Sequence, residues 1–154
     1  MIEGQSSTIA GSDLLSAGML RFHHIGVACR DVEKEMQAFS ILGYRIEGPP
    51  FQDPLQKISG CFLSGPGPRI ELLAPLDESS PVESWLKKDA KMYHQAFEVE
   101  SLAPAIAALS ARHAVVVSRP KPAIAFGGRK VAFLLCPNGL LIELIESLEP
   151  ANGG

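Results

Sequence analysis

The chain has 154 residues, of which 46% are hydrophobic and 20% are charged, and its formal net charge is −3. A chain of this length can bury a core without disulfides or a structural metal. The slightly acidic balance, with no run of Lys or Arg, argues against a nucleic-acid partner, and no apolar run approaches the ~18 residues of a membrane-spanning helix. The composition therefore predicts one soluble domain that binds neither nucleic acid nor a membrane.

The ends of the chain and its cysteines predict a cytoplasmic protein. Residues 1–20 are rich in Ser and Gly, and their only charges, Glu3 and Asp13, are not the positive start of a secretory signal. We expect them to form a flexible N-terminal extension, and residues 149–154 a short tail. The three cysteines are odd in number and lack C-x-x-C spacing, which is typical of reduced thiols.

The rest of the chain consists of two copies of one unit, in register at an offset of seventy residues. Residues 22–28 align with residues 92–98, which places His24 on His94. Asp31 and Ser101 also coincide, and both residue types favour the N-cap of a helix. Apolar side chains then recur with helical spacing in each copy: Val32, Met36 and Phe39 in the first, and Leu102, Ile106 and Leu109 in the second.

Short apolar runs bounded by Pro and Gly indicate strands around these helices. In chain order we expect a strand over 22–28, a helix from 32 ending at Gly43, strands over 44–47, 57–63 and 69–74, a short helix within 79–86, a strand over 92–98, a helix from 102, and strands over 114–118, 130–136 and 140–145. Each copy is thus a βαβββ module. The predicted α+β domain covers residues 21–148, with module one at 21–77, a connector at 78–90 and module two at 91–148.

Two histidines and two glutamates occupy matching positions in the modules. Strand alternation turns His24 away from the helix, over the small residues Gly26 and Ala28. Glu71 and Glu143 interrupt aliphatic strands and face opposite to their apolar neighbours. The His-to-Glu spacing differs by only two residues between the copies. Two imidazoles and two carboxylates predict a divalent metal site that takes Co, Zn, Ni, Mn or Fe.

Each of these residues also has a structural interpretation. A lone strand histidine is more often a hydrogen-bonded structural residue, and a lone glutamate often lies on the solvated face of its strand. The repetition of the pair favours ligation. Of the remaining histidines, we assign His113 to the surface and leave His23 unassigned.

The sequence resembles the vicinal oxygen chelate superfamily, which includes glyoxalases, bleomycin-resistance proteins and extradiol dioxygenases, and within it the methylmalonyl-CoA epimerases. The resemblance covers residues 21–147 and is carried by the segments at 23–28, 70–76, 80–82, 93–99 and 139–144. It implies two modules that form a curved, cup-like mixed or antiparallel sheet around a metal held by His24, Glu71, His94 and Glu143.

The resemblance also implies an activity. A divalent metal would chelate the carbonyl and carboxylate oxygens of a 2-substituted malonyl thioester and stabilise an enolate, while Glu143 moves the α-proton. The loop residues Gly127, Gly128 and Arg129 would bind the substrate, such as an acyl-CoA, and the protein would be a homodimer. Two alternatives remain: a glyoxalase-type isomerase or lyase with another oxygen-chelating substrate, and a non-catalytic protein that binds a small molecule.

The sequence departs from the epimerase pattern at four places. His23 replaces a frequent Asp, Tyr93 replaces a His, and Glu71 stands where some epimerases have Gln. The region around Gly60 lacks the acidic residue proposed as a second base in some members; Gln52, Asp53 and Gln56 are the nearby substitutes.

Overall fold

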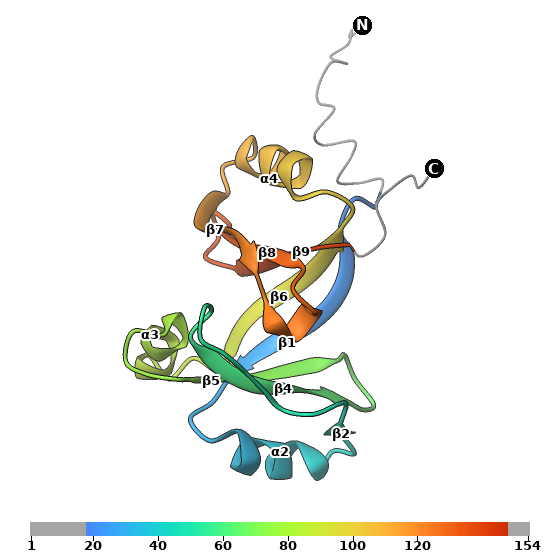
Figure 1. The fold of residues 1–154 in the computed structure, drawn as a ribbon, viewed down its shortest axis with the longest axis vertical. Coiled ribbons are helices and arrows are strands. Elements are labelled where there is room, and N and C mark those ends of the chain that lie inside the picture. The colour runs from blue at the N-terminus through green and yellow to red at the C-terminus, as the bar shows by residue number, and fades with distance from the viewer. Residues whose placement is uncertain (1–17, 148–154) are drawn as a thin grey trace, which may run out of the picture.

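The computed structural model describes residues 18–147 (Figure 1). The predictions for residues 1–17 and 148–154 lie outside the described residues. The elements are β1 (Arg21–Ala28), α2 (Val32–Ser40), β2 (Arg45–Ile46), β3 (Phe51–Asp53), β4 (Ile58–Ser64), β5 (Ile70–Pro75), α3 (Pro81–Lys87), β6 (Met92–Val99), α4 (Leu102–Ser110), β7 (Val115–Pro122), the 3₁₀ turn η1 (Ile124–Phe126), β8 (Lys130–Leu135) and β9 (Leu141–Glu146).

One mixed sheet runs through both modules and confirms the predicted α+β fold. Its strand order is β2-β4-β5-β1-β6-β9-β8-β7, with β3 paired to β4. The central pair β1–β6 is antiparallel, whereas β1 pairs with β5 and β6 pairs with β9 in parallel. The order reads as two equivalent halves that meet between β1 and β6. Helices α2 and α4 lie at opposite ends of the molecule (Figure 1).

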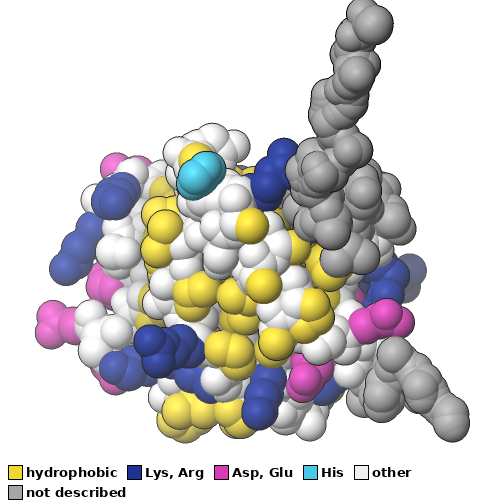
Figure 2. All heavy atoms as spheres, turned by 90° about the horizontal axis from the view of Figure 1, so that it is seen from above, with side chains coloured by type: hydrophobic (Ala, Val, Ile, Leu, Met, Phe, Trp, Pro, Cys, Tyr) yellow, Lys and Arg dark blue, Asp and Glu magenta, His cyan; other side chains and the backbone are white. Residues whose placement is uncertain are grey.

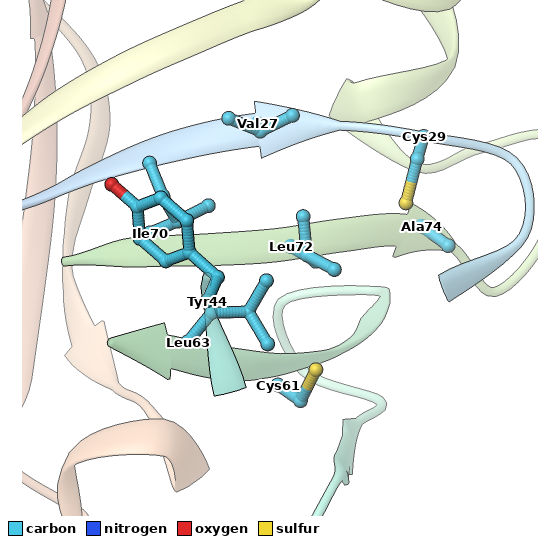
Figure 3. Close-up of a cluster of buried hydrophobic side chains, with 8 residues drawn as sticks. All are labelled: Val27, Cys29, Tyr44, Cys61, Leu63, Ile70, Leu72 and Ala74. Atoms are coloured by element: carbon cyan, nitrogen blue, oxygen red, sulfur yellow. The ribbon is translucent and has the colours of Figure 1, made fainter. Parts of the chain in front are cut away.

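Each half has a core between its helix and its part of the sheet. In the first half, side chains from β1, β4 and β5 meet Tyr44 (Figure 3). The apolar stripe of α2, formed by Val32, Met36 and Phe39, packs against this cluster. In the second half, Leu102 and Ala105 of α4 pack on β8 and β9. The Asp31 side chain accepts a hydrogen bond from the Lys34 N–H at 3.1 Å, which confirms the predicted N-cap. Ser101 precedes α4, but in the described part of the chain its side chain makes no capping bond.

Helix α4 differs from α2 in charge. It contains only Ala, Leu, Ile, Pro and Ser, whereas α2 carries Glu33, Lys34 and Glu35. On the face of the molecule seen from above, hydrophobic side chains occupy the middle and charged ones lie toward the rim (Figure 2).

No helix within residues 18–147 combines the length and apolar character that a membrane span requires.

The outer strand of each half shows where the copies diverged. In the second half it is the continuous β7, which extends beyond the predicted 114–118. In the first half the same stretch is split into β2 and β3, and the sequence analysis did not predict β3. Gly48, at φ +87°, and the two prolines that follow it separate the strands, because proline has no N–H to donate to the β4 ladder.

The chain leaves both long helices through a residue with left-handed backbone. Gly43 has this conformation after α2 (φ +97°), and His113 has it after α4 (φ +75°). The two are partners at the seventy-residue offset. Helix α2 ends at Ser40, so Gly43 closes the turn after the helix, where the Tyr44 N–H donates to the Phe39 carbonyl at 3.3 Å. The exposed His113 agrees with its predicted surface position.

Replacing His113 by glycine is therefore expected to stabilise the protein. A residue with a Cβ is strained at this φ, and we expect His113→Gly to raise the free energy of unfolding by about 0.5–1 kcal/mol. Urea denaturation of the metal-free protein measures the change. Gly43→Ala is the matched control and should lower the same quantity by a similar amount. A stability decrease in His113→Gly would contradict the interpretation.

Candidate metal centre and cavity

Two β-bulges position the candidate ligands. In the β1–β6 ladder, the pairing shifts once between Phe22 and His24, and once between Gly26 and Val27 opposite His94. His23 and Tyr93 are the extra residues. A bulge redirects side chains that strict alternation would place on opposite faces. His23 consequently lies beside His24, with their Nδ1 atoms 2.8 Å apart, and Tyr93 lies beside His94, with ring centroids 4.9 Å apart.

The structure brings together the four residues predicted as metal ligands. One donor atom from each of His24, Glu71, His94 and Glu143 lies within 4.8 Å of the other three, and all four residues are buried. The Nε2 atom of His24 is 2.8 Å from Glu71 Oε1 and 3.2 Å from His94 Nε2. The Nε2 atom of His94 is 3.1 Å from Glu143 Oε1. Each half thus contributes one imidazole and one carboxylate.

This donor set fits a divalent metal ion. Zn²⁺ and similar ions take His nitrogen and carboxylate oxygen ligands at about 2.0–2.2 Å. Ligand atoms at that radius around one ion lie roughly as far apart as the donors here. Glu143 Oε1 is also buried, and although His94 Nε2 lies 3.1 Å away, this oxygen accepts no well-aligned hydrogen bond within the described residues. A buried carboxylate oxygen is costly to leave unpaired, and a cation would compensate it.

Without a metal, the two carboxylates hold His24 in its charged form and also raise the pKa of His94. Burial disfavours the imidazolium of His24, but Glu71 and Glu143 outweigh it and raise the pKa of His24 to about 9. Burial likewise disfavours the Glu71 carboxylate, but the His24 charge and hydrogen bonds from both histidines lower the pKa of Glu71 to about 2. At neutral pH and without a metal, His24 therefore carries a proton on the ring nitrogen that a metal would occupy.

Metal binding should consequently release protons. Because the folded pKa of His24 is about 9, above its ordinary 6.5, its protonated form stabilises the metal-free fold fully below pH 6.5 and that stability is lost as pH rises through 9. A metal needs the neutral imidazole, so Zn²⁺ binding at pH 7 should release about one proton or more, and affinity should rise toward pH 9. Calorimetric titration in buffers of different ionisation enthalpy counts the protons. Affinity independent of pH between 6 and 9 would contradict this pKa.

Phenylalanines surround the centre symmetrically, with one exception. Phe62 packs edge-on against His24, and Phe133 against His94, each with ring centroids 5.3 Å apart. Phe126 of η1 adds a ring stacked on His24 at 5.9 Å. At the seventy-residue offset its partner is Gln56, which lies in the turn between β3 and β4. Phe126 therefore contacts both His23 and His24, and nothing equivalent lies at this position in the other half of the described residues.

A cavity of about 450 Å³ lies on the Tyr93 side. Glu71 and Glu143 contribute to its lining, and its aromatic walls are Tyr93, Trp85, Phe126 and Phe133. Lys57 and Lys121 are its basic residues. Phe133 was not identified from the sequence, although it lies one position from the residue that aligns with Phe62 at the seventy-residue offset. The candidate centre thus faces a space large enough for a small organic ligand.

The substitutes for a second base lie in different surroundings. Asp53 is buried and lines the cavity, but its Oδ1 accepts from the Leu55 and Gln56 N–H groups at 3.1 Å, and its Oδ2 accepts from the Ile124 N–H at 2.8 Å. It ties the first half to η1. Gln52 is exposed, and Gln56 donates to the Pro122 carbonyl. A Cβ at Gly60 would overlap the Leu72 carbonyl oxygen, so the backbone excludes any side chain there.

The predicted substrate residues Gly127, Gly128 and Arg129 are not part of the cavity lining, and their role stays a prediction. Gly127 and Gly128 close the turn after η1 with positive φ. The Arg129 guanidinium donates to Glu98 Oε2 at 2.8 Å and to the Glu146 carbonyl at 3.1 Å. Phe126 and Trp85 line the cavity. Phe51 lies against Phe62, with ring centroids 6.0 Å apart.

Residues 23–133 match the family described as the glyoxalase/bleomycin resistance protein/dioxygenase superfamily. The chain belongs to this superfamily. It is 33% identical to the ethylmalonyl-CoA/methylmalonyl-CoA epimerase of Cereibacter sphaeroides over 129 residues, which cover 80% of this chain and 96% of the relative. These matches confirm the resemblance found in the sequence.

Solved structures of superfamily members also resemble the fold. Methylmalonyl-CoA epimerase from Mycobacterium tuberculosis matches with a TM-score of 0.71 and 27% identity, over 86% of this chain and 90% of that one. A variant of the Streptomyces coelicolor methylmalonyl-CoA epimerase, in complex with 2-nitronate-propionyl-CoA, matches with a TM-score of 0.71 and 25% identity, over 85% and 99%. The three relatives named here are epimerases, which are isomerases.

Proposed function

We propose that this protein is a metal-dependent epimerase that inverts the α-carbon of a 2-substituted malonyl thioester of coenzyme A. The observation that carries the proposal is the buried set of two histidines and two glutamates whose carboxylates line a cavity of about 450 Å³. The relatives named methylmalonyl-CoA epimerase support the choice of substrate.

His24, Glu71, His94 and Glu143 would hold the divalent ion, for which Co, Zn, Ni, Mn and Fe are all suitable. When bound, such an ion acts as a Lewis acid that stabilises the negative charge developing as the α-proton leaves. Proton transfer and the exclusion of water depend on the side chains of the protein. Glu143 is the residue that we assign to proton transfer, because its Oε1 accepts no well-aligned hydrogen bond within the described residues and the residue lines the cavity.

The phenylalanines around the histidines would keep water away from the reacting carbon. Phe62 and Phe126 cover His24, and Phe133 covers His94. Charge is stabilised more strongly by fixed groups in a site that excludes water. The substrate would reach the centre through the cavity that Glu71, Glu143 and Tyr93 line.

Deuterium incorporation tests the proposal. The metal-loaded protein, prepared in turn with Co²⁺, Zn²⁺ and Mn²⁺, is incubated with methylmalonyl-CoA in heavy water, and mass spectrometry follows deuterium at the α-carbon. We expect incorporation that a chelator abolishes and added metal restores. If the protein binds metal but exchanges no α-proton, the epimerase proposal is wrong and the glyoxalase-type alternative gains support. If it binds no divalent metal, the binding-protein alternative does.

A further inference from the structure

The two candidate histidine ligands differ at the ring nitrogen that faces away from the centre. In His24, Nδ1 lies 2.8 Å from Nδ1 of His23. In His94, Nδ1 is buried and has no hydrogen-bond partner within the described residues. The difference arises although both ligands follow a bulge residue at matching positions, because that residue is His23 in one strand and Tyr93 in the other.

We infer that His23 is a positioning residue that fixes the tautomer and orientation of His24 for metal binding. When a neutral imidazole coordinates a metal through Nε2, its hydrogen is on Nδ1. His24 then donates this hydrogen to His23 Nδ1, which accepts with its lone pair. The second ring nitrogen of a metal-bound histidine usually donates to such a partner, which orients the ring and increases its basicity.

The surroundings of His23 hold its ring in place. Phe62 and Phe126 contact it edge-on, with ring centroids at 6.3 and 5.6 Å. The Arg69 guanidinium donates to the His23 carbonyl oxygen at 3.3 Å and pairs with Glu47 at 3.0 Å. Its Nη1 atom is also 3.5 Å from His23 Nε2, which is longer than an ordinary N–H hydrogen bond, so Nε2 is left to carry the ring hydrogen. The backbone and the ring are thus both restrained, so that Nδ1 stays directed at His24. This inference rests on the proposed metal centre and holds whichever reaction the centre performs.

Metal affinity tests the role without any measurement of activity. We expect His23→Phe, which keeps an aromatic ring but removes the acceptor, to weaken Zn²⁺ binding by about 10- to 100-fold. His23→Gln supplies a side-chain oxygen acceptor and should recover affinity to within about threefold of the unsubstituted protein. Tyr93→Phe is the matched control at the repeat position and should leave Zn²⁺ affinity unchanged. Affinity retained in His23→Phe, or equally lost in His23→Gln, would overturn the inference.

A measurement on the unsubstituted protein avoids the risk that a variant misfolds. Nitrogen-15 NMR of the Zn²⁺-loaded protein reports which ring nitrogen of each histidine carries hydrogen. We expect His24 to carry it on Nδ1, protected from exchange with water, and His23 to carry it on Nε2. Coordination of His24 through Nδ1, or hydrogen on Nδ1 of His23, would show that His23 does not accept this bond.

Discussion

Glu143→Gln is expected to bind metal but to exchange the α-proton of methylmalonyl-CoA about 10²- to 10⁴-fold more slowly than the unsubstituted protein. The amide has nearly the same shape and keeps an oxygen ligand, but it cannot accept a proton at neutral pH. Glu143 is buried and lines the cavity, so its side chain has the access that proton transfer requires. Deuterium incorporation at saturating Zn²⁺, normalised to bound metal, measures the loss.

Glu71→Gln is the matched control for this prediction. Glu71 occupies the equivalent strand position in the first half and also lines the cavity. The sequence pattern of some epimerases has Gln here, so we expect the variant to retain exchange within about tenfold once its metal site is saturated. Equal losses in both variants would indicate that the charge of the donor set, rather than a base at Glu143, limits the reaction. Full exchange in metal-loaded Glu143→Gln would rule out Glu143 as the base.

Gly26→Ala is expected to destroy the metal centre while leaving most of the fold intact. Gly26 pairs with Glu71 on one side and His94 on the other, and a Cβ there would overlap the His94 imidazole. The ring is buried, so it can only move away from the other ligands. A displacement of about 1 Å exceeds what a metal site tolerates, and we expect Zn²⁺ affinity to fall by at least about 100-fold. Calorimetric titration gives the affinity, and circular dichroism checks the fold.

The control for the glycine substitution is its partner in the other half. Ala96 pairs with His24 and Glu143 in the corresponding register. Ala96→Gly removes a methyl group instead of adding one, so it should cost about 1 kcal/mol of stability and leave Zn²⁺ affinity within a few-fold of the original. Unchanged affinity in Gly26→Ala would mean that the His94 ring can relax without leaving the centre.

The sequence was sufficient to predict that the four candidate ligands lie together, because repetition and alternation act together. Glu71 and Glu143 alternate with aliphatic residues that pack under the helices, so their faces could be predicted without coordinates. The bulges at His23 and Tyr93 could not, because a single extra residue in a ladder depends on the register of the partner strand. This is why His23 remained unassigned in the sequence and lies against His24 in the structure.

The repeat pattern also could not predict the differences between the halves. The pattern predicts equivalent outer strands, but the prolines after Gly48 divide one of them into β2 and β3. Phe126 stacks on His24, and its offset partner gives no hint of this. The hydrogen bond from the Arg129 guanidinium to Glu98, which is distant in sequence, also could not be predicted. Long-range pairing of this kind becomes visible only in three dimensions.

Because the donor atoms are divided between the halves, an ion bound at the centre would also connect the two halves of the molecule. Each half supplies one histidine and one glutamate, so neither half holds enough ligands for an ion by itself. An ion at that position would connect β1 and β5 to β6 and β9. The hydrogen bond that Asp53 accepts from the Ile124 N–H is a further connection between the halves. Loss of the ion would therefore loosen the junction of the halves before it disturbed either helix-covered core. A substitution that removes the ligands of one half could not be compensated by the ligands of the other half.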